Sequence, residues 1–250
     1  LADSGLPLSL KAYFLRIDEQ PVARIYATWY PELVAAREKI MVAVNRLYRE
    51  QLLAEFLRLD SLSSGRQTTL QEGIEKRMLK QVLLELITID DTEDSHRLIL
   101  DEVRAAVTAT ERVSALSALN RSSAPSRREV LEKTYEEWHA HLSGYANYLR
   151  IISSGTREDV FDMIEAEKKR PTFDITQPTW CRALFLPMAT NNKMVWTDRG
   201  IEWVADTVIE LAGVNVITAS RLLNTFQPVG LLKPDLKEKV RPAVEKIARK

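Results

Sequence analysis

Two arginines in the last third of the chain have the side-chain type and setting to bind an anionic group. Arg182 follows Trp180 and Arg221 precedes Leu222, each within an apolar run. A guanidinium can bind a carboxylate through two parallel hydrogen bonds, so either residue suits the recognition of a carboxylate. Their spacing leaves a second interpretation open, in which each arginine forms a structural salt bridge with a neighbouring helix.

The other side chains with catalytic potential lack the spacing that hydrolytic or metal chemistry needs. The three histidines are His96, His139 and His141. The last two are two residues apart and point in different directions on a helix, whereas a helical zinc pair needs four-residue spacing. The single cysteine, Cys181, lies in an apolar run, which is typical of a packed residue. No glycine-rich phosphate loop occurs. We expect no catalytic activity and no metal site in this chain.

The two arginines are expected on the first and third of three consecutive helices. Pro178 favours the start of the first helix, Thr197 can cap the second, and the third is expected from Asn215 to Pro228. Asn191 is interpreted as part of the C-terminal cap of the first helix. If consecutive helices alternate between two layers, the first and third share a layer, and both arginines face one concave surface.

The rest of the chain also shows the helical spacing of apolar residues, without the alternating β-branched runs that indicate strands. Helices are expected over 8–17 and 21–29, from Pro31 to Leu59, from Thr69 to Ile89, after Thr92, around 115–119, from Arg127 with a break at Ser143–Gly144, after Thr156, and from Pro234. The predicted fold class is therefore all-α: an irregular α-solenoid, a superhelix of stacked helix pairs of the armadillo or HEAT type. A single compact α-bundle is the alternative.

The composition excludes several function classes. Of the 250 residues 45% are hydrophobic, and 35 Lys and Arg balance 35 Asp and Glu. A net charge of zero argues against a nucleic-acid partner. No window approaches the run of about 20 apolar residues that spans a membrane, so no membrane association is expected. One cysteine fits a reducing compartment, and we expect a cytoplasmic protein. A chain that begins at Leu1 without methionine is expected to be part of a longer protein.

Several segments together resemble the C-terminal domain of bacterial-type aminopeptidase N, the zinc metallopeptidase family that includes the alanyl aminopeptidases. They are Asn-Tyr-Leu-Arg-Ile-Ile-Ser (147–153), Pro-Thr-Phe-Asp (171–174), Arg-Ala-Leu-Phe (182–185), Ala-Ser-Arg-Leu-Leu-Asn (219–224), Glu-Lys-Thr-Tyr-Glu-Glu-Trp (132–138) and Ala-Leu-Ser-Ala-Leu-Asn (115–120). The likeness runs over nearly the whole chain and is densest after residue 130. It rests on the order and spacing of these segments together.

The resemblance implies that residues 1–250 form a single helical domain, the C-terminal part of a longer multidomain aminopeptidase. The zinc ligands and the general base would then lie in a catalytic domain outside this chain. The implied partners are the catalytic and β-domains of that enzyme and its peptide substrate. The resemblance further implies that the helical domain closes the catalytic chamber and limits peptide access. It places Arg182 and Arg221 toward the carboxylate or the backbone carbonyls of a bound peptide.

A second function, from a different class, remains open on the sequence. An α-solenoid can act as a free-standing scaffold that binds protein partners along its concave face. The missing methionine and the missing polar capping repeat at the start of the chain favour the aminopeptidase domain over the scaffold.

Overall fold

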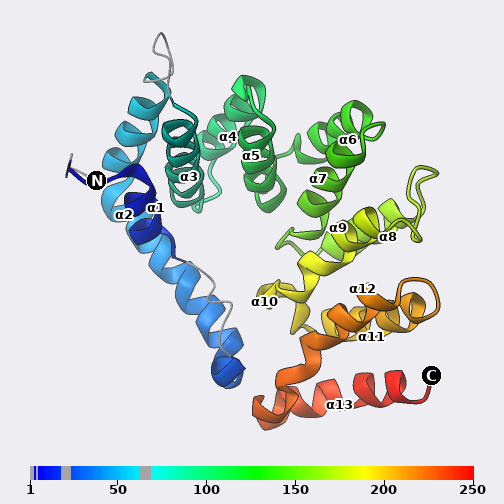
Figure 1. Cartoon of the computed structure of the whole chain (residues 1–250). Helices are drawn as coiled ribbons and strands as arrows, with labels where there is room; N and C mark the ends of the chain where they lie inside the picture. The colour runs from blue at the N-terminus through cyan, green and yellow to red at the C-terminus, as the bar shows by residue number, and fades with distance from the viewer. Residues whose placement is uncertain (1–2, 4, 18–23, 62–68) are drawn as a thin grey trace. The chain divides into compact units, whose positions relative to one another are not determined.

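A computed structural model describes residues 3, 5–17, 24–61 and 69–250 (Figure 1). These residues form helices joined by short links and contain no strand, which confirms the all-α prediction. The elements are α1 (Leu8–Leu15), η1 (Arg24–Trp29), α2 (Tyr30–Ser61), α3 (Leu70–Ile87), α4 (Glu93–Ala105), α5 (Ala109–Arg121), α6 (Arg127–Trp138), α7 (Leu142–Ser153), α8 (Val160–Lys168), α9 (Pro178–Ala189), α10 (Asn192–Val195), α11 (Asp198–Ala212), α12 (Val216–Leu223), η2 (Asn224–Leu231) and α13 (Pro234–Ala248). No helix in the described part is long and apolar enough to cross a bilayer.

The chain divides into two compact units. Unit 1 comprises Leu1–Asp18 and Ala36–Arg128, and unit 2 comprises Glu19–Ala35 and Glu129–Lys250. Helix α2 therefore begins in unit 2 and continues in unit 1. That residues 1–250 act as one helical domain of a longer protein stays a prediction.

In unit 1, α3 is the central helix. It packs against α1 and against α5, which in turn packs against α4. Contacts with two neighbours require two apolar faces, and α3 buries Leu79, Leu83 and Leu86 together with Val82 and Ile87. Apolar residues on different sides of this one helix are thus buried against different neighbours.

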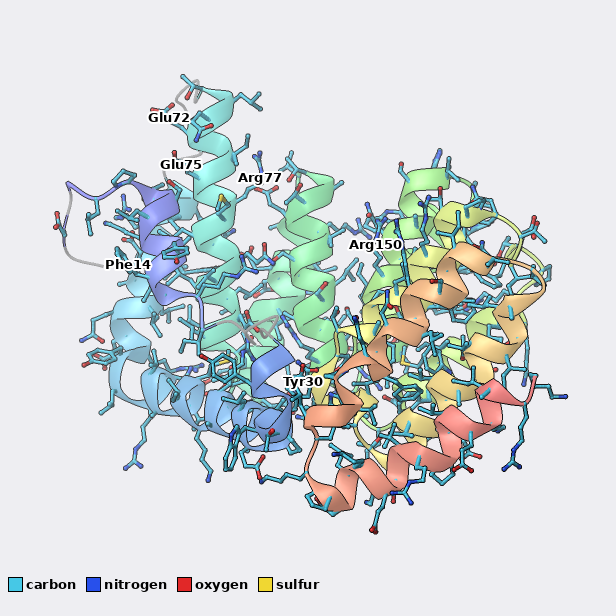
Figure 2. The ribbon with its side chains drawn as sticks, turned by 60° about the horizontal axis from the view of Figure 1, so that its bottom comes forward. Phe14, Tyr30, Glu72, Glu75, Arg77 and Arg150 are labelled. Carbon is cyan, nitrogen blue, oxygen red and sulfur yellow. The ribbon has the colours of Figure 1, made fainter. Side chains whose placement is uncertain are left out.

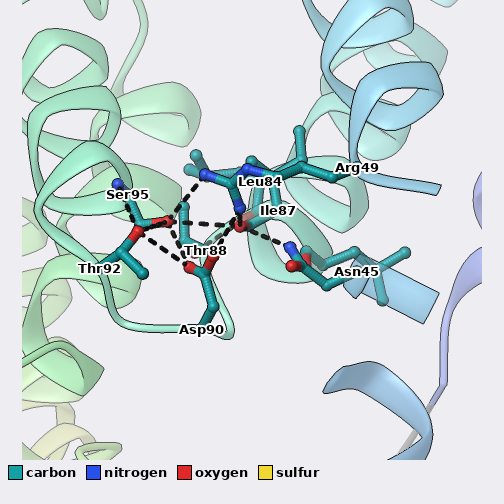
Figure 3. A network of polar contacts seen from close by, with 9 residues as sticks. Asn45, Arg49, Leu84, Ile87, Thr88, Asp90, Thr92 and Ser95 are labelled. Carbon is teal, nitrogen blue, oxygen red and sulfur yellow. Dashed lines mark hydrogen bonds and ion pairs between the residues drawn. The ribbon is translucent and has the colours of Figure 1, made fainter. Parts of the chain in front are cut away.

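The C-terminal end of α3 is held by polar side chains of α2 (Figure 3). The buried Asn45 amide donates to the carbonyls of Leu86 and Ile87, both at 2.8 Å, and Arg49 donates to Ile87 at 2.8 Å. The last carbonyls of a helix have no intrahelical donors, so these bonds satisfy groups that would otherwise be buried unpaired. Between the two donors, Tyr48 has a non-helical backbone (φ −129°, ψ 15°), which kinks α2 at this contact.

Local capping explains where several helices begin. The Thr69 hydroxyl accepts from the Glu72 backbone N–H, and Glu72, labelled in the first turn of α3 (Figure 2), accepts in return from Thr69. This capping box satisfies two donors that a helix start leaves free. The side chains of Thr92, Thr197 and Asn215 each accept from the backbone N–H three residues ahead and so cap α4, α11 and α12. The sequence predicts the helix starts at these three positions.

In unit 2, α7, α9 and α12 follow one another in a layer, because α9 packs against both α7 and α12 (Figure 1). Helix α11 packs against α12 and α13. The expected break at Ser143–Gly144 is wrong, since α6 ends at Trp138 and α7 begins at Leu142. Gly144 lies inside α7, where a Cβ would lie 3.1 Å from the Trp138 carbonyl oxygen, so the glycine allows close packing of the two helices.

Two other predicted helices differ from the structure in type or in their first residue. The helix expected over 21–29 is a 3₁₀ helix over Arg24–Trp29, and residues 21–23 lie outside the described part. The cap expected at Thr156 is wrong, because α8 begins at Val160 after Asp159.

Unit 2 also joins residues that are about two hundred positions apart. The Tyr30 ring, labelled in Figure 2, stacks on Trp196 with ring centroids 5.5 Å apart. Lys233, which precedes α13, forms an ion pair with Glu32 in the first turn of α2. The residues near the start of α2 therefore complete the packing of the C-terminal helices.

Candidate functional site

Arg182 lies on the exposed side of α9. Its neighbours Cys181 and Ala183 are buried, and they fix the guanidinium on the outer face of the helix. Arg182 Nε donates to the Pro178 carbonyl at 2.9 Å, which orients the side chain along the first turn. No described carboxylate forms an ion pair with Arg182.

Arg221 lies on the exposed side of α12, one turn after the buried Thr218. Within the described residues its guanidinium has neither a hydrogen bond nor an ion pair. The neighbouring Val216 and Ile217 are each 66% exposed, so the outer face of α12 combines apolar side chains with one uncompensated cation. Such a face suits a group that is both anionic and partly apolar.

The structure brings the two arginine-bearing helices together. Helices α9 and α12 pack against each other, and the Cys181 thiol lies beside the Thr218 hydroxyl at their contact. The prediction that the first and third helices of this stretch share a layer is therefore confirmed. Arg182 follows Cys181 directly and Arg221 lies one turn after Thr218, so both cations are carried close to the line along which the helices meet.

Cys181 is buried and free. Burial raises the pKa of its thiol, with smaller opposing effects from Thr218 and from the Arg182 charge. A nucleophilic cysteine needs a lowered pKa and an accessible sulfur, and Cys181 has neither. The residue acts as part of the apolar packing between α9 and α12.

Asn191 serves the C-terminal end of α9 through its backbone, because its N–H donates to the Met188 carbonyl at 3.1 Å. Its Oδ1 accepts from the Met194 N–H at 3.3 Å, so Asn191 caps the start of α10. Its Nδ2 donates to the Gly155 carbonyl at 2.8 Å, and the side chain is only 7% exposed. Asn191 is a buried structural residue that joins two loops.

The histidines are separate from one another and have other partners. His96 Nε2 lies 2.8 Å from Asp91 Oδ1, and the His139 ring stacks on Tyr135 at 4.9 Å between centroids. His141 occupies the position before α7. The described residues contain no group of three or more His, Cys, Asp or Glu side chains that could hold a metal ion. The side chains of this part of the chain do not fit a zinc site.

A buried polar cluster in unit 2 has no counterpart in the sequence prediction. Glu167, only 3% exposed, accepts from the Tyr148 hydroxyl and from Arg170 Nε, each at 2.9 Å. Burial raises the pKa of Glu167, although Arg170 and Tyr148 act in the opposite direction. Arg170 also pairs with Glu132 and lies 3.8 Å from the centre of the Tyr135 ring. The Glu-x-x-Arg spacing of Glu167 and Arg170 occurs on many exposed helices, so the sequence offers no signal for this burial.

Comparison with known families identifies the domain. The family described as "Domain of unknown function (DUF3458_C) ARM repeats" matches residues 1–250. The chain belongs to this family. ARM repeats are stacked helices, so the match agrees with the helix-on-helix packing within each unit and confirms the α-solenoid prediction.

Relatives with known names are aminopeptidases. Aminopeptidase N of Caulobacter vibrioides is 22% identical over 260 residues, which cover 99% of this chain and 29% of the relative. Aminopeptidase N of Escherichia coli is 20% identical over 213 residues, which cover 84% of this chain and 24% of the relative. The chain thus spans less than a third of the length of these relatives. The resemblance to the C-terminal domain of aminopeptidase N is confirmed.

A solved structure shares the fold. Aminopeptidase A of Legionella pneumophila, determined in complex with aspartic acid, superposes with a TM-score of 0.83 at 19% identity. The match covers 99% of this chain and 30% of that protein. At this identity the similarity shows the arrangement of the helices. It does not show what the side chains of the site do.

Proposed function

We propose that this chain is the non-catalytic C-terminal helical domain of a cytoplasmic, zinc-dependent aminopeptidase N that removes N-terminal residues from peptides. The family match and the names of the relatives support this proposal. The described residues do not fit a zinc site, so the zinc ligands and the catalytic groups are assigned to the remainder of a longer protein. The partners in this proposal are the catalytic and β-domains of that protein.

The proposed role of the helical domain is to close the catalytic chamber and limit the access of peptides. Stacked helices present a broad and relatively rigid surface, which suits a cover better than a mobile loop. A cover that narrows the entrance selects short or unfolded peptides over folded proteins. The domain then contributes to substrate choice without contributing a catalytic residue.

The observation that carries the site assignment is the pair of exposed arginines without ion pairs on adjacent helices, Arg182 on α9 and Arg221 on α12. A surface arginine commonly has a carboxylate partner nearby, and an unpartnered one remains available to a ligand. We assign both to the C-terminal side of the bound peptide, where they meet its carboxylate or backbone carbonyls. Since the catalytic domain holds the amino end, the anionic end remains for these cations.

The size of the effect depends on how far water is excluded. A charge-assisted hydrogen bond to a carboxylate contributes about 1.5–3 kcal/mol when it is shielded from solvent, and less when it is exposed. A guanidinium that contacts the end of the peptide stabilises ground state and transition state alike. Its loss therefore raises KM and leaves kcat nearly unchanged.

An add-back assay tests the proposal. This chain is mixed with the separately expressed catalytic part of the enzyme, and cleavage of an alanyl tetrapeptide is followed with a free or an amidated C-terminus. We expect the chain to bind and to change peptide turnover. We expect Arg182→Ala and Arg221→Ala to bind normally and to raise KM for the free-acid peptide about three- to tenfold.

The matched control is Arg241→Ala, which removes an exposed arginine from α13. It should leave KM for both peptides unchanged. If the arginine variants act equally on the acid and the amide, the carboxylate assignment is wrong and a role toward backbone carbonyls remains. If the chain does not bind the catalytic part at all, the free-standing scaffold becomes the better hypothesis.

A further inference from the structure

The layer formed by α7, α9 and α12 carries charge of one sign only. Each of these helices has a single charged residue, and in each case it is an arginine: Arg150, Arg182 and Arg221. The three helices contain no aspartate, glutamate or lysine, although 28% of the chain is charged and its carboxylates and cations balance. The layer therefore concentrates positive charge within a chain whose net charge is zero.

Arg150, labelled in Figure 2, is the third arginine of this layer. It is exposed on α7, where its Nη1 donates to the Asn147 side-chain oxygen at 3.0 Å. Among the described residues Arg150 forms no ion pair. Since Asn147 is neutral, the hydrogen bond orients the guanidinium and leaves its positive charge uncompensated.

A contact between α7 and α9 places Arg150 level with Arg182. The Ser153 hydroxyl of α7 donates to the Ala183 carbonyl of α9 at 3.1 Å. Arg150 lies three residues before Ser153, and Arg182 lies directly before the accepting residue. With a rise of about 1.5 Å per residue, the two arginines are within about one helical turn of each other along the helix axes. Residues three apart share one side of a helix, so Arg150 lies on the side of α7 that is next to α9.

The contact between α9 and α12 places Arg221 at the same level. The Cys181 thiol lies beside the Thr218 hydroxyl. Arg182 follows Cys181 directly, and Arg221 follows Thr218 by three residues, so these two arginines are also within about one helical turn. Packed helix axes are about 8–10 Å apart. Arg150, Arg182 and Arg221 thus form a row across the layer, with one cation on each helix, which we call the arginine row.

Carboxylates of the described residues do not balance the arginine row. Glu210 of α11 is the carboxylate that acts on the Cys181 thiol beside Arg182. It forms an ion pair with Lys168 of α8 at 2.6 Å. No described carboxylate forms an ion pair with an arginine of the row. The three guanidinium groups therefore remain available to an anionic ligand.

We propose that the arginine row binds an extended acidic peptide, with one carboxylate at each arginine. The inference rests on the proposed function, and it names the preferred substrates as peptides that are acidic toward their C-terminal end. An extended chain rises about 3.3 Å per residue, so residues three apart are about 10 Å apart. This length matches the distance between neighbouring helices of the layer. The C-terminal carboxylate occupies one arginine, and two acidic side chains occupy the others.

The side chains beside the arginine row favour a peptide over other anions. Single-stranded nucleic acids bind to cationic surfaces that also offer exposed aromatic side chains, on which the bases stack. Arg221 instead has the aliphatic Val216 and Ile217 as neighbours on α12, each 66% exposed. A single small anion would contact one arginine and leave the other two without a partner. A peptide with several carboxylates provides a partner for each cation and apolar contacts for the aliphatic residues.

An NMR titration tests the proposal on the whole 250-residue chain. The probes are acetyl-Glu-Ala-Ala-Glu-Ala-Ala with a free C-terminus and the same peptide with glutamine in place of both glutamates. We expect the acidic peptide to shift the amide signals of Arg150, Arg182 and Arg221. An exposed ion pair contributes up to about fivefold in affinity, so two of them should make the acidic peptide bind about tenfold more tightly than the glutamine peptide. Added salt should reduce this preference.

A variant of Arg150 tests the residue that the proposal adds. Arg150→Gln keeps a long polar side chain without the charge, and it should reduce the preference for the acidic peptide about threefold. The matched control is Arg241→Gln, which removes an exposed arginine from α13 in the same unit. It should leave the preference unchanged.

Three results would overturn the proposal. The first is equal binding of the two peptides, and the second is an unchanged preference in Arg150→Gln. The third is tighter binding of an eight-nucleotide oligothymidylate than of the acidic peptide, which would assign the arginine row to a nucleic acid. The titration needs no catalytic domain, so these results leave the closure of the chamber to the add-back assay. Conversely, a chain that binds the acidic peptide and fails to bind the catalytic part supports the arginine row and refutes the chamber role.

Discussion

A methyl group added at Gly200 should strongly destabilise unit 2. Gly200 lies in the first turn of α11, where its N–H donates to the Thr197 cap at 3.0 Å. A Cβ built on Gly200 would lie 2.1 Å from the Met194 carbonyl oxygen and 2.7 Å from that of Val195. Carbon and oxygen atoms that are not bonded do not approach below 3.0 Å, so Gly200→Ala forces α10 and α11 apart.

The loss of stability in Gly200→Ala can be estimated from the contacts that are lost when α10 and α11 move apart. The contacted atoms belong to the backbone, so no side-chain rotation relieves the clash. Overpacking of this kind costs about 1–3 kcal/mol, and loss of the Thr197 cap adds about 1 kcal/mol. We expect the free energy of unfolding to fall by about 2–4 kcal/mol. At about 3 °C per kcal/mol for a chain of this size, the melting temperature falls by about 6–12 °C.

Tryptophan fluorescence during urea or thermal unfolding measures this effect directly in unit 2. All five tryptophans of the chain belong to unit 2: Trp29, Trp138, Trp180, Trp196 and Trp203. Gly213→Ala is the matched control, because it makes the same change at the C-terminal end of the same helix. There a Cβ meets no atom within 4 Å and the backbone is right-handed helical (φ −89°, ψ −10°). We expect Gly213→Ala to be neutral or to stabilise the chain by less than about 1 kcal/mol.

The reasoning would be refuted by a Gly200→Ala protein that unfolds within about 0.5 kcal/mol of the wild type, the usual range of a harmless surface substitution. A large loss in Gly213→Ala would equally refute it, because a methyl group would then be harmful in α11 without any close contact.

Two further changes test the buried polar groups. Burial raises the folded-state pKa of Glu167 above its ordinary value of 4.5, so the ionisation of this side chain lowers stability as the pH rises from about 4.5 through the folded pKa. Glu167→Gln removes this titration, so the free energy of unfolding of the variant minus that of the wild type, measured by urea denaturation, should rise over this pH range; a difference that stays constant or falls would contradict the raised pKa. Asn45→Ala leaves the Leu86 carbonyl without its side-chain donor and should lower stability by about 2 kcal/mol, measured by circular dichroism because unit 1 contains no tryptophan. An Asn45→Ala protein as stable as the wild type would show that water replaces the amide.

Helix starts and the layer order were predictable because their causes are local. Thr69, Thr92 and Thr197 cap helices through hydroxyl groups that reach only three residues ahead. The packing of α9 against α12 followed from the alternation of stacked helices, which also placed Arg182 and Arg221 on adjacent helices. Short-range hydrogen bonds and regular stacking are encoded by spacing, and spacing can be read along a sequence.

Features that depend on distant residues were not predictable from spacing. Asn191 has the residue type of either a C-cap or an N-cap, and its bond to the Gly155 carbonyl, 36 positions earlier, does not follow from local spacing. Gly144 lies close to the Trp138 carbonyl across the break between α6 and α7, a contact that the spacing of the sequence does not show.

The long-range contacts of Tyr30 and Glu32 have a consequence for synthesis on the ribosome. Unit 1 is complete once residue 128 has left the exit tunnel, whereas Glu32 finds its partner Lys233 only after 201 further residues. Domains fold as units during synthesis, and contacts between distant residues form slowly. The buried Tyr30 of the nascent chain therefore stays without its stacking partner until Trp196 has emerged. Unit 1 should thus fold first on the ribosome, and the start of α2 should gain its contacts with the C-terminal helices last.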